Sequence, residues 1–228
     1  MTTLIEIGRA VADKVQLDRP LSLAGATDPG AQRLLQLAQE AGDEIARAFP
    51  WQALRRERVF AALAQEEQAG ILPADFDRFV PETFWDRSSG RLLGGPVAPA
   101  TWAALKARGH AGPPLFALRG HAVLVIPPPD GGAALAFEYV SRHWCASAAG
   151  AGQAAWAADD DVAVIDGDLV QFHMTAAFLD GEGQPAALAL HRYRQRLATL
   201  IANDQGAVEL LGAGDLFEGG ARFRDLSL

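Results

Sequence analysis

The residues with the greatest potential for metal chemistry are five histidines and a run of three aspartates. A metal site needs several imidazoles or carboxylates that converge at ligand spacing. The histidines stand apart, with no pair four residues apart, and each is expected to be a surface or hydrogen-bonded interior residue: His110, His121, His143, His173 and His191. Asp159–Asp161 lacks the alternating ligands of a calcium loop, so we expect a solvated cap just before a helix. The sequence therefore predicts no metal and no other cofactor.

Two further patterns could support nucleophilic or phosphate chemistry. Cys145 lies two residues after His143 at the end of an expected strand, which places both on one face. No third orienting group is identifiable, so a buried or incidental cysteine is favoured over a Cys–His nucleophile. Residues 150–155 match the phosphate loop G-x-G-x-x-A, but Trp156 and three aspartates stand where its helix is needed. Neither pattern is typical of an active site.

The one notable basic cluster consists of Arg55, Arg56 and Arg58. A groove that follows nucleic-acid phosphates needs more cations, interleaved with aromatic side chains. We therefore interpret the cluster as a solvated face. Because no set of residues assembles a catalytic site, we expect a protein that is not an enzyme.

Helices are predicted at both ends of the chain. Thr3 to Glu6 forms a capping box before an apolar stripe that includes Ile7 and Val11, and Pro20 closes this region. Asp28 and Pro29 suit the cap and first position of a second helix, whose apolar stripe is Leu34, Ala38, Ala41, Ile45 and Phe49. Near the other end, residues 166–179 and then 184–202 have helical periodicity.

The middle of the chain has the character of β-structure. Residues 122–144 read as an antiparallel hairpin, because two β-rich runs flank a Pro/Asp/Gly cluster at 127–132. Alternation in the second run predicts that Leu135, Phe137 and Tyr139 are buried and that the other face is at least half exposed to solvent. Further expected elements are a strand over 54–63, a polar turn at 65–70, a short edge strand within 72–81, a helix over 99–108, a strand over 115–118 and a small-residue linker at 146–158 anchored by Trp156.

This order of elements predicts an α+β fold. Helices from the two ends can pack together only if the middle of the chain is an insertion between them. For this reason we expect a helical bundle from residues 1–50 and 160–204, with an inserted antiparallel β-rich lobe at 51–159. A C-terminal docking tail is expected at 205–228.

Composition limits the classes of partner. The net charge of −8 argues against a protein that grips nucleic acid through a basic surface, although an acidic wall suits DNA that passes without sticking. No apolar run is long enough to span a membrane, so no membrane partner is expected. A single cysteine excludes an internal disulfide framework and indicates an intracellular origin.

Seven short phrases of the sequence stand out together: residues 2–7, 27–29, 51–54, 72–79, 85–87, 137–141 with 144–145, and 155–159. Together they resemble the head-to-tail adaptor (connector) proteins of tailed bacteriophages, a group similar to the P22-type tail accessory factor. The resemblance runs from the N-terminus to roughly Asp168, after which residues 170–175 stand in place of the basic, Trp-rich helix that is typical of the family.

This resemblance implies a structural role in the virion, at the capsid–tail junction. Such adaptors form a ring, typically of twelve copies, beneath the portal protein. They extend the channel through which genomic DNA passes, and they present a platform for tail or nozzle proteins. C-terminal segments of several members dock onto the portal.

The C-terminal residues themselves also suggest an interface. They include large apolar side chains in a stretch too rich in glycine to form its own core, so we expect order against a neighbour. The predicted contacts to another subunit or the portal are Leu210, Leu211, Phe217 and Phe223.

Two alternatives remain open. Some members of the broader group have been credited with peptidoglycan hydrolysis, which needs two carboxylates across a cleft. The acids that could be proposed are Glu82 with Asp86, or Glu138 with Asp159, although no spacing singles them out. The other alternative is a tail-completion or host-side binding module.

Overall fold

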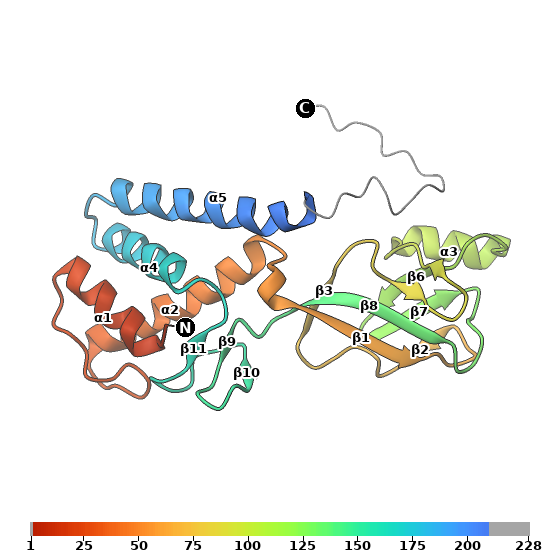
Figure 1. Ribbon diagram of the computed structural model, residues 1–228, viewed down its shortest axis with the longest axis horizontal. Helices are drawn as coiled ribbons and strands as arrows, with labels where there is room; N and C mark the ends of the chain where they lie inside the picture. Colours follow the sequence, from red (N-terminus) through yellow and green to blue (C-terminus); the bar gives the residue numbers. More distant parts are fainter. Residues whose placement is uncertain (1, 210–228) are drawn as a thin grey trace.

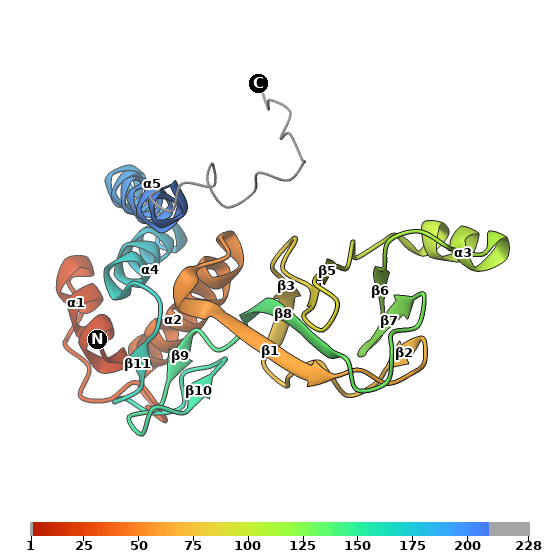
Figure 2. The same cartoon turned by 45° about the vertical axis from the view of Figure 1, so that its right-hand side comes forward.

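The computed structural model, which describes residues 2–209, places helices at one end of an elongated molecule and strands at the other (Figure 1). Helices from both ends of the chain lie together, and the β-rich segment between them protrudes as a lobe (Figures 1 and 2). The α+β class predicted from the sequence, with its bundle of terminal helices and inserted antiparallel lobe, is confirmed.

The helical part contains four helices whose ends follow local sequence signals. Thr3 caps the first helix through the predicted capping box with Glu6, and Asp28 caps the second, with Pro29 at its first position. Asp166 accepts from the amide of Leu169 and so caps the third. These helices are α1 (Leu4–Val15), α2 (Pro29–Ala48), α4 (Gly167–Gly181) and α5 (Ala187–Glu209).

One contiguous apolar core holds the four helices together. The predicted stripe of α2 is buried at Leu34, Ala38, Ala41 and Ile45, and Phe49 is half-buried. Helix α4 lies at the centre of the packing, since it contacts α1, α2 and α5. The core also includes Trp51, Trp144 and Trp156 from the inserted segment, so the lobe is attached through the helical core itself.

The first sheet of the lobe is organised around its longest strand, β8. Strand β1 pairs antiparallel along one edge of β8, and β3 and β4 pair along the other, with β5 beyond β4. A short 3-10 turn (Gln52–Leu54) leads into β1. The strands are β1 (Arg55–Ala61), β3 (Phe76–Phe79), β4 (Trp85–Asp86), β5 (Arg91–Leu92) and β8 (Ala134–Ser141).

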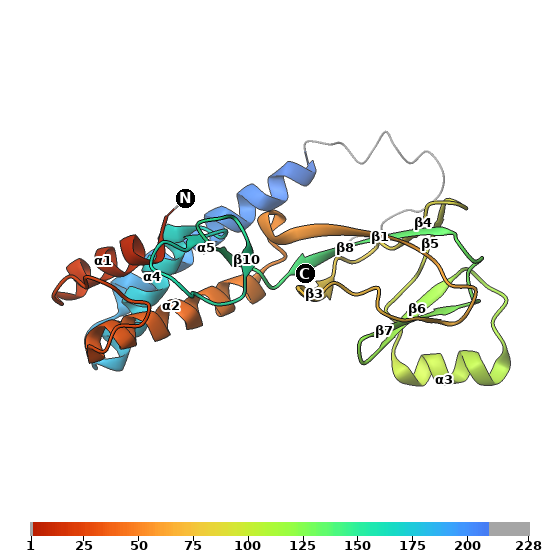
Figure 3. The same ribbon diagram turned by 90° about the horizontal axis from the view of Figure 1, so that it is seen from below.

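A second sheet and one helix complete the lobe. The order of this sheet is β2 (Glu67–Gln68), β7 (Ala122–Ile126) and β6 (Leu115–Arg119). An aromatic cluster fills the space between the two sheets, and Phe137 contributes to it from β8 and Phe116 from β6. Helix α3 (Pro99–Arg108), predicted over the same residues, packs Trp102 on the far face of the second sheet. The lobe therefore has three layers: sheet, sheet and helix (Figure 3).

The predicted hairpin over residues 122–144 is wrong. Its two runs do form strands, β7 and β8, but these belong to different sheets and do not pair with each other. Both edges of β8 are already used by β1 and by β3 and β4, and both edges of β7 by β2 and β6. The Pro-rich connection at 127–133 carries the chain from one sheet to the other.

Other expectations for the lobe also need correction. On β8, Leu135, Phe137 and Tyr139 are buried as predicted, but so are Ala136 and Val140 on the face expected to be wet. The expected polar turn at 65–70 contains β2. Gln68 is fully buried there, and hydrogen bonds between its side-chain amide and backbone groups of Leu63 and Gln65 offset the cost of that burial. The strand predicted over 54–63 and the edge strand within 72–81 are confirmed as β1 and β3.

The segment after β8 is more ordered than the predicted linker. It contains β9 (Cys145–Ala146) and β10 (Gly152–Gln153), which form a small sheet with β11 (Val162–Ala163). The aspartate run does not cap a helix: Asp161 is buried and accepts from the amides of Ala157 and Ala158. Asp159 accepts from the amides of Leu23 and Ala24, so these acids instead tie loops to the helical part.

Candidate functional site

The residues predicted to form an interface lie outside the described part of the chain. Leu210, Leu211, Phe217 and Phe223 all follow the last described residue of α5, Glu209. The described residues instead reveal a different structural site, where the lobe meets the helices. We call this site the joint. It is formed by five residues and the groups they contact: Trp51, Asp75, Arg78, Trp144 and Trp156.

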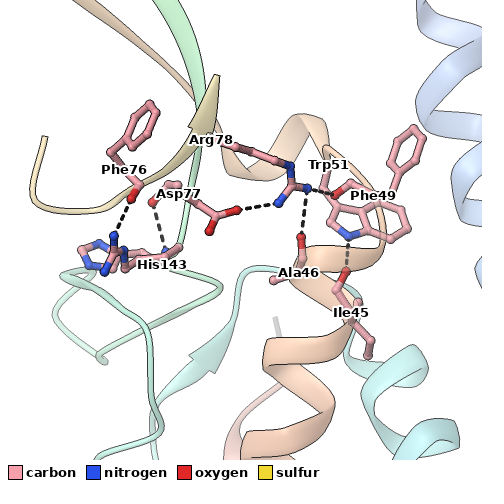
Figure 4. Close-up of polar contacts among 10 residues, drawn as sticks. Ile45, Ala46, Phe49, Trp51, Phe76, Asp77, Arg78 and His143 are labelled. Carbon is pink, nitrogen blue, oxygen red and sulfur yellow. Dashed lines mark hydrogen bonds and ion pairs between the residues drawn. The ribbon is translucent and has the colours of Figure 1, made fainter. Parts of the chain in front are cut away.

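Arg78 connects the lobe to the end of a helix. Its side chain reaches from β3, and the guanidinium donates to the carbonyl oxygens of Ala46 at 3.5 Å and Phe49 at 3.2 Å (Figure 4). The last carbonyls of an α-helix have no partner within the helix and carry partial negative charge. Arg78 therefore acts as the C-terminal cap of α2 from a strand distant in sequence.

Trp51 fixes the turn by which the chain leaves α2. Its indole Nε1 donates to the carbonyl of Ile45 at 2.7 Å, and its ring meets Phe49 edge-on at a centroid distance of 5.1 Å (Figure 4). The indole is buried, so this bond satisfies a donor that would otherwise be costly. The direction in which β1 leaves the helical part is set here.

Asp75 ties β3 to the end of β8. Its carboxylate accepts from the hydroxyls of Ser141 at 2.6 Å and Tyr139 at 3.1 Å, and its carbonyl accepts from the amide of Arg142 at 2.8 Å. Burial disfavours the charged form, but the hydrogen bonds outweigh it and hold the pKa of Asp75 below its ordinary value of 3.8. Burial and the Asp75 carboxylate together raise the pKa of Tyr139 to about 12.

Trp144 anchors the other side of the joint. Its ring lies against Gly42 of α2, where a Cβ atom would come within 2.4 Å of the ring, and its Nε1 donates to Asp43 at 2.9 Å. Trp156 packs edge-on against it at 5.2 Å and donates to the carbonyl of Ala38. Two tryptophans from the part of the inserted segment that follows β8 thus pack on helix α2. A hollow of about 340 Å³ beside Trp144 is lined mainly by polar groups of α2, β3 and the end of β8.

Several of the short phrases that resemble the adaptor family meet at this joint. They come from four stretches of the sequence: Trp51, residues 72–79, residues 137–141 together with Trp144, and Trp156. Sequence reasoning did not foresee the role of Arg78 or of Gly42. No local signal marks either residue, because each acts on a partner more than twenty residues away.

The sequence candidates for chemistry have structural roles in the described residues. Burial, reinforced by Asp161, raises the pKa of the Cys145 thiol to about 12, so it is held as the unreactive thiol. Its Sγ lies 3.4 Å from the carbonyl of Gln153, and His143 is not among its hydrogen-bond partners in residues 2–209. Arg56 is exposed as expected, whereas Arg55 and Arg58 are half-buried and donate to the carbonyls of Pro50 and Ile71.

Two of the four carboxylates considered for hydrolysis, Asp86 and Asp159, accept hydrogen bonds in local structure. Asp86 accepts from the amides of Ser88 and Ser89 in a tight turn. Burial opposes the charge on Asp159, but hydrogen bonds from Ser22 and from backbone amides outweigh it and lower its pKa. A general acid for glycoside hydrolysis requires the opposite shift.

Within residues 2–209, no three His, Cys, Asp or Glu side chains are grouped so that they could hold a metal ion. Of the helices in that range, none is both long and apolar enough to cross a bilayer.

Comparison with known proteins identifies a family for this chain. A family model described as "SU10 adaptor protein" matches residues 2–212, so the similarity continues well past Asp168, where the resemblance was expected to end. No curated protein matches the chain.

Proposed function

The chain belongs to the SU10 adaptor protein family, and from this premise we propose that it forms a ring that binds the portal protein of a tailed phage, extends the DNA channel and presents the platform for tail attachment. The family match over residues 2–212 is the observation that carries this proposal. It makes the protein a phage adaptor with a structural role.

Two physical features support the finer assignment. A net charge of −8 suits a channel wall that does not retain DNA, because each cationic contact to a phosphate would add affinity. The joint suits a structural adaptor, because it combines a capped helix end with buried tryptophans and so holds the lobe in one orientation on the helices. The partners in this proposal are the portal, other copies of the chain and tail or nozzle proteins.

We propose a division of labour along the chain. Residues 1–50 and 160–204 form the supporting bundle, residues 51–159 form the lobe, and residues 205–228 form a docking tail. In the tail, Leu210, Leu211, Phe217 and Phe223 contact a neighbouring subunit or the portal. These four apolar side chains lie in a glycine-rich segment with too few neighbours in sequence for a core of its own.

Native mass spectrometry of the full-length chain, with and without portal, tests this function. We expect a closed ring on the portal for the full-length chain, and only monomer for a chain that lacks residues 207–228. Circular dichroism of the truncated chain should still show the folded helical and β content. Rings formed by the truncated chain on the portal would contradict the role of the tail, and no full-length ring under any ratio would contradict the adaptor assignment.

A further inference from the structure

Three exposed apolar side chains form a straight row on the outer face of the first sheet. Val59 on β1 and Trp85 on β4 both lie directly opposite Ala136 of β8, and Trp85 lies directly opposite Leu92 of β5. Residues directly opposite in antiparallel strands point to the same face. Val59, Trp85 and Leu92 are 47%, 37% and 36% exposed. We call this line of side chains across four strands the apolar row.

The two outer faces of the lobe are treated differently by the described part of the chain. On the second sheet, the outward Ala117 and Leu124 are buried because Trp102 of α3 packs on them. On the first sheet, the opposite face of β8 packs into the aromatic cluster, and no described helix or strand lies over the apolar row (Figure 3). The outer face of the second sheet is thus covered by a helix, whereas the equivalent face of the first sheet is uncovered within the described residues.

Two carboxylates flank the apolar row. Glu57 and Glu138 lie directly opposite each other, one step along the same face from Val59 and Ala136. Like charges in this arrangement repel. Arg87 pairs with Glu57, whereas the Glu138 carboxylate has no ion pair or hydrogen bond within the described residues. A segment that binds this face would bind best if it carried apolar side chains, which match the apolar row, next to a cation, which matches Glu138.

The C-terminal segment combines these properties. Residues 210–228 contain Phe217 and Leu226, and Phe223 is flanked by Arg222 and Arg224. Phenylalanine fits the apolar row, and an arginine beside it fits the unpaired carboxylate. Asp215, Glu218 and Asp225 make the segment as a whole slightly acidic, so its match to this face rests on residues 222–224, where two arginines flank Phe223.

The last described turns of α5 lie against the residues that lead into the lobe. The backbone amide of Gln52 donates to the Asp204 carboxylate, and its side-chain amide donates to the Asp204 carbonyl, three residues before β1 begins. Helix α5 then continues to Glu209, about 7 Å further along its axis. Residues 210–228 can span at most roughly 60 Å when fully extended, and this is the reach available to the segment.

We propose that the apolar row, with Glu138 at its edge, is the docking surface for the C-terminal segment 210–228 of the neighbouring copy in a ring. This inference rests on the proposed function, because a ring is built from head-to-tail contacts between two different surfaces of one chain. The segment supplies one surface and the row supplies the other. A segment that stayed on its own sheet would cover the row but leave the subunits unlinked.

Cysteine cross-linking of the full-length chain on the portal tests this geometry. Val59→Cys and Phe223→Cys chains are mixed, treated with a short bis-maleimide and separated on a denaturing gel. We expect a covalent dimer from the mixture, and a ladder of higher multiples from a chain that carries both substitutions. The native Cys145 is buried and unreactive. The matched control replaces Val59→Cys with Leu21→Cys, which is exposed on a loop of the helical part and should give no dimer.

The other outcomes each overturn the inference. A cross-link confined to one chain in the double variant would assign the segment to its own sheet, and a product with the portal alone would assign it to the portal. Full-length rings without any 59–223 product would refute this docking surface while leaving the proposed function intact. Absence of wild-type rings on the portal would refute the proposed function instead.

A second variant set measures the contribution of the row and of the charge. Val59→Ser with Leu92→Ser should raise the concentration for half-assembly by about tenfold or more, the scale of a truncated interface hot spot. Its melting curve should match wild type, because both side chains are already exposed. Glu138→Arg should weaken assembly, and Arg222→Glu with Arg224→Glu in the same chain should restore it. Unchanged assembly in the Val59/Leu92 variant would contradict the proposal.

Discussion

The helical part and the β-lobe of this protein stabilise themselves in different ways. The helical part has a single core to which both ends of the chain contribute, together with three tryptophans from outside the helices. The lobe depends on an aromatic cluster between two sheets, in which Phe137 touches Phe60, Phe76, Phe79 and Phe84. One outer face of the lobe is covered by α3, and the other presents the apolar row. This comparison fits our proposal that the helical part serves as the support and the lobe as the presenting surface.

The largest effect is expected from the buried tryptophan at the joint. Trp144 is 1% exposed and fills the space above Gly42, so Trp144→Ala should lower the free energy of unfolding by about 3–5 kcal/mol. Trp85→Ala is the matched control, because this tryptophan is partly exposed and its loss should cost less than about 1 kcal/mol. Urea unfolding followed by circular dichroism measures both. Equal losses for the two variants would contradict this view of the joint.

The next effect tests whether the lobe unfolds together with the helices. Phe137→Ala removes the ring at the centre of the aromatic cluster and should lower the free energy of unfolding by about 3–4 kcal/mol. This loss is slightly smaller than that expected for Trp144→Ala, because the neighbouring rings can partly collapse into the space. Because the tryptophans of the joint belong to the helical core, we expect one cooperative transition. Near-ultraviolet and far-ultraviolet dichroism should change at the same urea concentration. Separate midpoints would show that the lobe is an independent unit.

Asp75 is expected to make the stability of the protein depend on pH. Asp75→Asn should cost about 1–2 kcal/mol at neutral pH, because the charged acceptor of two hydroxyls is lost. The pKa of Asp75 is lowered in the folded state, so its contribution is complete above the ordinary value of 3.8 and is lost as the pH falls through the lowered pKa. The stability difference between wild type and Asp75→Asn should therefore shrink below pH 4. A constant difference from pH 7 to pH 2 would refute this.

The smallest of these effects is expected at the helix cap supplied by the lobe. Arg78→Met keeps the apolar stem but removes the cation from the carbonyls of Ala46 and Phe49, which should cost about 1 kcal/mol. Amide exchange should become faster in the last turn of α2 and remain unchanged in α1. Arg47→Met is a suitable control, because Arg47 is exposed in the same turn. A larger loss at Arg47 than at Arg78 would contradict the assignment of the cap.

Some parts of the fold were predictable and others were not, for reasons visible in particular residues. The helix starts at Thr3, Asp28 and Pro99 follow from side chains within a few residues of each helix, and all three were predicted correctly. The pairing of β7 and β8 was predicted wrongly, because alternation shows which face of a strand is buried but not which strand lies beside it. At the candidate site, Asp75, Tyr139 and Trp144 belong to the family phrases, but the sequence does not show that these phrases meet in space. The tail residues Leu210, Leu211, Phe217 and Phe223 stay a prediction.

By itself, the sequence determined the helices, the class of fold and the family. Periodicity and capping are local, and the family phrases can be read without knowing their partners. Only the tertiary structure decided that Arg78 caps α2, that Gly42 must lack a side chain beneath Trp144, and that Val59, Trp85 and Leu92 form one line. Each of these depends on contacts between residues far apart in the chain, and such contacts are selected by the packing of the whole molecule.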